Sequence, residues 1–318
     1  MHSPYSRSPF GTPLTPDEVV RQLQHLPSAP KVLPRLKQLL IDANSSIRDV
    51  VDMIRLDPGI AARVLQMGNS AYFSQGLRCY TVEEAVNRVG YDQVYELVAN
   101  AVASHVLVRP LAVYGLEADQ LWERSVACAL AAELLAERIE VDRDIAYTVG
   151  LLHGVGMVAI DEWAFRQHPE LRFAPATLPL ETCEAERATL GFHNAEVGAA
   201  LLRFWEFPAV MSEPVRWQYM PRSTAAHFKT ASIVAVAKWL RSTVCHPSIP
   251  LRLPDPLALQ ALKLRAVELD SLAGLVRARL SQVSTLLEPA GQEQFSLPFP
   301  NGERSLLETG FARNAVNL

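Results

Sequence analysis

Apolar residues recur along most of the chain at spacings of three and four, which is the period of an α-helix that buries one face. The pattern is clear after Pro58, where Ile60, Ala61, Val64 and Leu65 fall on one side of a helix. No stretch shows the strict alternation of apolar and polar residues that is typical of a half-buried strand. The pattern therefore predicts an all-α fold.

Several predicted helices begin at a residue that can cap an N-terminus and is followed by an acidic residue or a proline. These starts are Thr15 with Glu18, Ser46 with Asp49, Asp57 with Pro58, and Thr81 with Glu84. Later helices follow from apolar spacing and from breaks at glycine and proline. We expect helices over about residues 16–24, 58–69, 81–90, 94–108, 121–139, 181–190, 194–204, 210–219, 225–240, 257–264 and 271–287.

Pro110 and Gly115 interrupt the helical pattern and indicate a boundary between two parts of the chain. We expect an N-terminal helical lobe over residues 15–112 and a second helical lobe over 118–287. Residues 1–14 are predicted to be a flexible N-terminus, and residues 288–318 a mobile tail, because proline, glycine and polar residues dominate there.

One apolar segment, residues 149–160, contains a single histidine, His153, and three glycines. The absence of large polar residues predicts one buried helix, and the glycines predict that it packs closely at the histidine. A histidine on such a helix is either a residual ligand or a core residue bonded to a backbone carbonyl.

Composition narrows the class of protein. The chain has 318 residues, of which 49% are hydrophobic and 20% charged, and its net charge of −4 gives no overall reason to expect nucleic-acid binding. Cys79, Cys128, Cys183 and Cys245 form no CxxC pair, which favours a reduced, intracellular setting. No signal peptide and no apolar run of about 18 residues is present, so we expect a cytoplasmic protein.

A series of short motifs runs through about residues 20–285 in a fixed order. The motifs are Leu26-Pro27 with Pro30, Ile54-Arg55-Leu56-Asp57-Pro58, Arg63-Val64-Leu65, Gly68-Asn69-Ser70-Ala71, Thr81, Ala85, Arg88-Val89-Gly90, Leu121-Trp122, Ser125, Gly150-Leu151-Leu152-His153, and His193 with Ala195-Glu196-Val197-Gly198. As an ordered set they resemble the HDOD proteins, whose domain is a helical relative of the HD phosphohydrolases found in bacterial signalling. The resemblance implies a two-lobed helical HDOD fold with a degenerate HD-like C-terminal lobe.

The same resemblance allows the metal site of HD enzymes to be compared with this chain. In those enzymes an adjacent histidine and aspartate bind a divalent ion, whereas this chain reads His153-Gly154, and glycine has no side chain. Most of the other ligand positions are also changed. A histidine remains at His153 and His193, and a ligand is lost at Arg124, Gly154, Gln218 or Tyr219, and Lys238.

Two of these replacements reverse the local charge. A guanidinium such as that of Arg124 is never a metal ligand, and Lys238 is normally protonated. We therefore expect no metal and no cofactor, and we predict a pocket for an anion at Arg124, His153, His193 and Lys238. In the structural alternative, His153 is a core histidine and Arg124 pairs with a neighbour such as Glu123.

The most family-like stretch contains Asp57, Arg63, Asn69 and Ser70, which are candidate interaction residues. The structural alternative makes Asp57 an N-cap, Arg63 one half of an ion pair, and Asn69 a helix terminator.

The resemblance implies a non-catalytic regulatory protein in bacterial signal transduction, acting on a protein partner or on a small anionic ligand such as phosphate or a nucleotide. The residues outside the two lobes leave no room for a receiver or cyclase domain, so we expect the input to arrive by contact or by expression. One alternative is a residual HD phosphohydrolase with metal at His153, His193 and unidentified carboxylates. Another is a nucleic-acid-binding regulator with a basic face around Arg216 and Arg222.

Overall fold

The structure is a computed structural model, and throughout the part that it describes the chain is helical, with one isolated antiparallel bridge between Leu111 and Leu116. The all-α prediction is confirmed. Three predicted segments lie largely or wholly outside the described residues: the flexible N-terminus over 1–14, the helix over 94–108, and the tail from residue 288. The described residues are 14–23, 32–41, 45–74, 76–90, 93–94, 97, 110–173, 179–222, 226–248 and 251–287.

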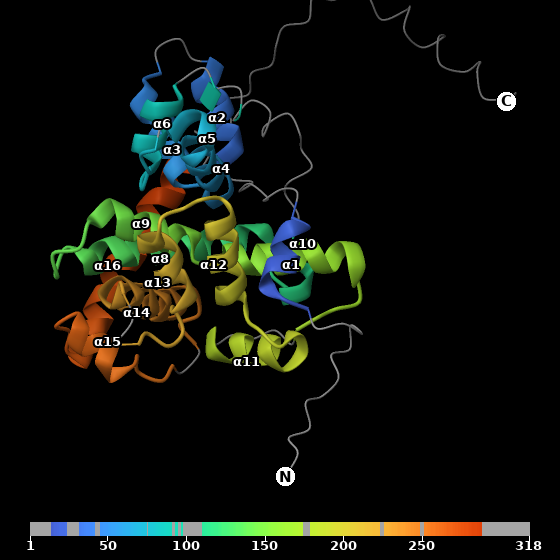
Figure 1. Cartoon of the computed structure of the whole chain (residues 1–318). Helices are drawn as coiled ribbons and strands as arrows, with labels where there is room; N and C mark the ends of the chain where they lie inside the picture. The colour runs from blue at the N-terminus through green and yellow to red at the C-terminus, as the bar shows by residue number, and fades with distance from the viewer. Residues whose placement is uncertain are drawn as a thin grey trace, which may run out of the picture. The chain divides into compact units, whose positions relative to one another are not determined.

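Helices α2 to α6 form one group (Figure 1). Helix α4 packs against α3, α5 and α6, and α2 packs against α3. The start signals are confirmed, because the side chains of Ser46, Asp57 and Thr81 each accept a hydrogen bond from the backbone N–H three residues later. The helices are α2 (Val32–Ile41), α3 (Ile47–Arg55), α4 (Pro58–Asn69), α5 (Ala71–Ser74) and α6 (Val82–Val89).

The first helix, α1 (Pro16–Arg21), packs against α10 and α12 rather than against its neighbours in sequence. Its predicted capping box is present: Thr15 accepts from the Glu18 backbone N–H, and the Glu18 carboxylate accepts from the Thr15 N–H. The helix ends at Arg21, a few residues earlier than predicted.

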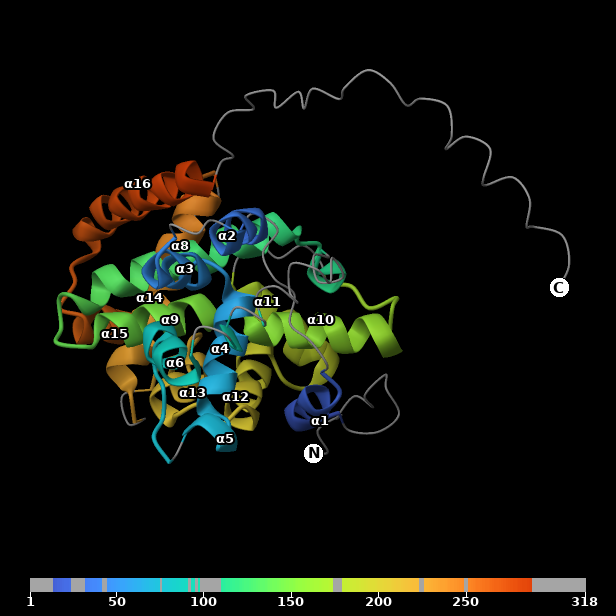
Figure 2. The ribbon, with the colours of Figure 1, turned by 90° about the horizontal axis from the view of Figure 1, so that it is seen from above.

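In the second group of helices, α8 packs against α9, α14 and α16, and α16 also contacts α14 (Figure 2). Helix α12 packs against α10 and α13. None of the described helices is long and apolar enough to span a bilayer. The elements are η1 (Ala112–Tyr114), α8 (Ala118–Ala136), α9 (Arg143–Leu152), α10 (Val155–Gln167), α11 (Pro179–Leu190), α12 (Asn194–Phe204), α13 (Ala209–Arg216), α14 (Phe228–Cys245), α15 (Pro256–Ala261), η2 (Ala266–Glu268) and α16 (Leu269–Leu287).

The prediction of one helix over residues 149–160 is wrong, since α9 ends at Leu152 and α10 begins at Val155. The turn falls at His153 and Gly154. In an unbroken helix the Gly150 carbonyl would accept from the Gly154 N–H, but here it contacts Nδ1 of His153 at 2.6 Å. The histidine side chain therefore takes a bond that would have continued the helix.

The close packing in this segment lies on either side of the histidine rather than at it. A Cβ atom added to Gly150 would lie 2.9 Å from the Ala129 Cα of α8. One added to Gly156 would lie 1.8 Å from the backbone oxygen of Asn194 at the start of α12. A Cβ on Gly154 would meet only Leu121 Cδ1, at 3.9 Å. Gly150 and Gly156 therefore allow the close helix contacts, and Gly154 does not.

Two hydrogen bonds, one buried and one partly buried, join the second group of helices to the end of α3. Trp122 Nε1 on α8 donates to the Leu56 carbonyl at 2.9 Å, and the Tyr147 hydroxyl on α9 donates to the Arg55 carbonyl at 3.0 Å. The motifs around residues 54–58 and 121–122 are thus neighbours in space. The division into lobes at residues 113–117 remains a prediction.

Candidate functional site

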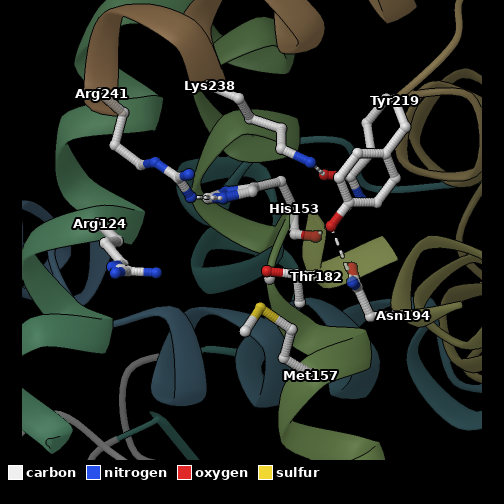
Figure 3. Close-up of a pocket in the computed structure, with 10 residues that line it drawn as sticks. Arg124, His153, Met157, Thr182, Asn194, Tyr219, Lys238 and Arg241 are labelled. Carbon is white, nitrogen blue, oxygen red and sulfur yellow. Dashed lines mark hydrogen bonds between the residues drawn. The ribbon is translucent and has the colours of Figure 1, made fainter. Parts of the chain in front are cut away.

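A small cavity of about 20 Å³ lies among residues from α8, α10, α11, α12 and α14, from the turn that precedes α10, and from the segment after α13 (Figure 3). Every changed ligand position in the comparison with HD enzymes lines it. Of the positions compared with HD enzymes, the cavity is lined by Arg124, His153, Gly154, Gln218, Tyr219 and Lys238.

His153 is buried at the centre of this arrangement (Figure 3). Its Nδ1 faces the Gly150 carbonyl, which can only accept, and its Nε2 lies 3.2 Å from Nη1 of Arg241, which can only donate. The ring is therefore neutral, with its proton on Nδ1. Burial, together with the charges of Arg241 and Lys238, holds the His153 pKa well below its usual value, which agrees with this assignment.

Lys238 is buried on α14 and has two contacts. Its Nζ donates to Oε1 of Gln218 at 2.7 Å and lies 3.3 Å from the centre of the Tyr219 ring, a cation–π geometry. The Gln218 amide in turn donates to the His153 carbonyl at 3.0 Å. Burial, reinforced by the Arg241 charge, lowers the Lys238 pKa well below its usual value.

Arg241 lies on the same face of α14 as Lys238, three residues later, and is also buried. Besides its contact with His153, it donates from Nη2 to the Ser242 hydroxyl at 3.0 Å. The comparison with HD enzymes does not select Arg241. Its position three residues after Lys238 places it on the same helix face, and that spacing is the sequence feature that could have indicated it.

Arg124 reaches the cavity from α8 and is only partly buried. Its Nη2 lies 2.8 Å from Nε2 of His246, which must accept because a guanidinium only donates. Burial and the neighbouring Arg241 charge lower the Arg124 pKa to about 10, so the group stays cationic at neutral pH. The suggested pairing with Glu123 is replaced by this contact with a neutral imidazole.

A buried carboxylate lies beyond the opposite side of the cavity. Glu186 on α11 accepts from the Tyr114 hydroxyl at 2.6 Å, and from the backbone and side-chain nitrogens of Asn194 at 2.7 to 3.0 Å. The Asn194 amide also donates to the Tyr219 hydroxyl at 2.8 Å (Figure 3). Nothing in the sequence marked Glu186, since no motif surrounds it.

Burial raises the Glu186 pKa to about 7, against the opposing effect of its hydrogen bonds. A carboxyl group with a raised folded-state pKa contributes stability that is fully present below its unfolded pKa and is lost as pH rises through the folded pKa. The stability advantage of wild type over Glu186→Gln should therefore fall by about 2.5 kcal/mol between pH 5 and pH 8. Urea unfolding of both proteins at several pH values measures it, and a pH-independent difference would contradict it.

The residues at this cavity do not fit a divalent metal. Arg124 is a cation, the Lys238 Nζ is already held by Gln218 and the Tyr219 ring, Gly154 has no donor, and the Nε2 lone pair of His153 is directed at Arg241. Within the described ranges, no group of three or more histidine, cysteine, aspartate or glutamate side chains is placed to hold an ion.

His193, which the comparison with HD enzymes included, does not line the cavity. It precedes α12, and its ring packs edge-on against Tyr219 with centroids 5.5 Å apart. Its Nδ1 is 3.7 Å from the Glu196 carboxylate. His193 therefore supports a wall of the cavity from behind.

The candidate interaction residues near α4 have local structural contacts. Asp57 caps α4, and the Asn69 side chain exchanges two hydrogen bonds with the backbone of Cys79, at 2.8 and 3.1 Å. The Ser70 hydroxyl donates to the Met67 carbonyl, and Arg63 is half-buried with its pKa lowered by burial. Their role in an interaction remains a prediction.

The proposed basic face around Arg216 and Arg222 consists of two exposed guanidinium groups. Both lie over the ring of Trp217, at 5.3 and 4.6 Å from its centre.

Comparison with known proteins gives a family match over much of the chain. The model of the HDOD domain matches residues 26–221. An uncharacterised protein of Treponema pallidum is 26% identical over 228 residues, which are 69% of this chain and 42% of that protein. This chain thus spans less than half the length of that relative.

Two solved structures share the fold. The MmoQ response regulator from Methylococcus capsulatus superimposes with a TM-score of 0.65 at 20% identity, over 79% of this chain and 98% of that one. A virulence factor from Campylobacter jejuni superimposes with a TM-score of 0.59 at 19% identity, over 86% of this chain and 94% of that one. At these identities the likeness concerns the fold alone.

Proposed function

We propose that this chain, which belongs to the HDOD domain family, is a regulatory protein of signal transduction that acts by binding and not by catalysis. Its output is contact with a protein partner, and its cavity takes a small anionic ligand. One observation carries the proposal: every changed metal-ligand position of an HD enzyme lines one cavity, where Arg124, a buried lysine and a glycine stand in place of ligands and the free nitrogen of His153 faces an arginine.

This arrangement opposes phosphoester hydrolysis of the HD type. Such hydrolysis needs a metal to lower the pKa of a bound water and to stabilise charge on the phosphoryl oxygens. Cationic side chains can bind a phosphoryl group, but they cannot generate the hydroxide. No carboxylate lines the cavity among the described residues, and the lone pair of the neutral His153 faces Arg241, so neither a carboxylate nor this imidazole is placed as a general base there.

Metal analysis combined with an activity assay tests the proposal. The full chain, purified and incubated in turn with Mn²⁺, Fe²⁺ and Mg²⁺, should retain far less than one ion per chain after desalting. It should also hydrolyse neither bis(p-nitrophenyl) phosphate nor a cyclic dinucleotide above the buffer rate. Stoichiometric metal, with turnover that His153→Ala abolishes, would refute the non-catalytic role.

The support for a protein partner comes from family membership, and its test is separate. The full chain should capture a defined protein from a bacterial lysate, and that complex should re-form from the two purified proteins. Failure to re-form it would remove the partner and leave the cavity unaffected.

A further inference from the structure

We infer that the cavity binds one compact inorganic anion, with Arg241 and Arg124 as its ligands. The inference deepens the proposed function and rests on it, because a cavity that retained a divalent metal would not have this charge. It narrows the ligand from any small anion, including a nucleotide, to an ion of the size of chloride or phosphate.

The main argument is the buried charge of Arg241. Its side chain is in a residue only 7% exposed, and a guanidinium remains protonated in proteins. The partners described for it, His153 Nε2 and the Ser242 hydroxyl, are both neutral. Among the described ion pairs, none includes Arg241. An uncompensated buried charge is costly, so an anion in the cavity would stabilise this arrangement.

Arg124 supplies the second ligand. It lies with Arg241 on one side of the His153 ring, whereas Asn194 and Tyr219 lie on the other (Figure 3). Its described partner, His246, is neutral as well, since Nε2 accepts from the guanidinium. Each guanidinium carries five N–H donors, and the described contacts leave several of them for a ligand.

Lys238 lines the cavity but is not one of the proposed ligands. Its ammonium is held by Gln218 and by the face of the Tyr219 ring. The Gln218 amide is fixed by the His153 carbonyl, so the lysine cannot turn away without breaking both contacts. Lys238 therefore fixes the Gln218 and Tyr219 side of the cavity, and the two arginines are left as the ligands.

The small size of the cavity favours a compact anion. At about 20 Å³ it has room to enclose one compact ionic group, and it is partly open to solvent. A nucleoside phosphate would have to leave its nucleoside outside the cavity, away from the two arginines. The planar fork of arginine favours an oxyanion, which it can bind through two parallel hydrogen bonds, and chloride would use the same donors singly.

Thermal unfolding and titration calorimetry test the inference on the full chain. Phosphate, chloride and AMP serve as probes at a constant ionic strength, maintained with potassium gluconate in a zwitterionic buffer. Either phosphate or chloride should bind once per chain and raise the midpoint of unfolding by roughly 5 °C at a hundredfold excess over its dissociation constant. AMP should bind at least tenfold more weakly.

Three variants separate a specific site from the general effect of salts on stability. Arg241→Gln and Arg124→Gln should each weaken binding at least tenfold, whereas Arg277→Gln, on the exposed face of α16, should bind as wild type does. If Arg241→Gln does not fold, Arg124→Gln decides. Three results would overturn the inference. They are wild-type affinity in Arg241→Gln and Arg124→Gln, no binding of either inorganic ion by wild type, and binding of AMP as tight as that of the inorganic ions. If the anion does not bind but the protein also retains no metal and hydrolyses no phosphodiester, this inference fails and the proposed non-catalytic function stands.

Discussion

Gly156→Ala is expected to destabilise the protein by about 4 kcal/mol or more, so that little folded protein remains at 37 °C. The added Cβ would lie 1.8 Å from the Asn194 carbonyl oxygen and 2.7 Å from the Gly198 N–H nitrogen. Both atoms belong to the backbone of α12, and a helix cannot yield locally as a flexible side chain can. The N-terminal ends of α10 and α12 would have to move apart. This movement would also disturb the hydrogen bonds from Asn194 to Glu186.

Gly154→Ala, two residues earlier, is the matched control. Its backbone is already in the right-handed helical region, with φ −92° and ψ −1°, and the nearest atom to a new Cβ is 3.9 Å away. We expect it to be neutral or to stabilise by up to about 1 kcal/mol. Urea unfolding followed by circular dichroism measures both variants. Similar stabilities would show that the contact between α10 and α12 is not tight.

The sequence predicts the starts of α1, α3, α4 and α6 because their capping signals are local. Ser46 and Thr81 act within three residues of themselves, and the structure contains those hydrogen bonds. The turn at His153 was missed because it depends on a side chain that competes for a carbonyl, and apolar spacing does not record such competition. The same spacing could not show which of the glycines faces a neighbouring backbone.

The candidate site was only partly predictable. Comparison with HD enzymes selects positions where ligands were lost, and it placed Arg124 and Lys238 at one cavity. It could not select Arg241 or Glu186, because neither occupies a ligand position of an HD enzyme. Glu186 is recognised only from its burial beside Tyr114 and Asn194, which are distant in sequence.

The second large effect is expected at Trp122, which joins α8 to the residue after α3. Trp122→Ala should cost about 5 kcal/mol, because it removes a side chain in a residue only 1% exposed and leaves the buried Leu56 carbonyl without its indole donor. The Tyr147 hydroxyl on the adjacent Arg55 carbonyl does not compensate, since each carbonyl has its own donor. Urea unfolding monitored by circular dichroism measures the loss.

Trp239→Ala is the control for the same substitution elsewhere. Its Nε1 also donates to a carbonyl in a separate segment, that of Arg252 at 2.8 Å, but that bond is exposed and the ring is only partly buried. Water can replace the exposed bond, so the loss should be no more than about 2 kcal/mol. Equal losses at the two tryptophans would mean that the burial of Trp122 and its bond to Leu56 together contribute no more than a partly exposed contact. A much larger loss at Trp122 would instead show that its buried contacts, including the bond between the family motifs around residues 54–58 and 121–122, stabilise the fold.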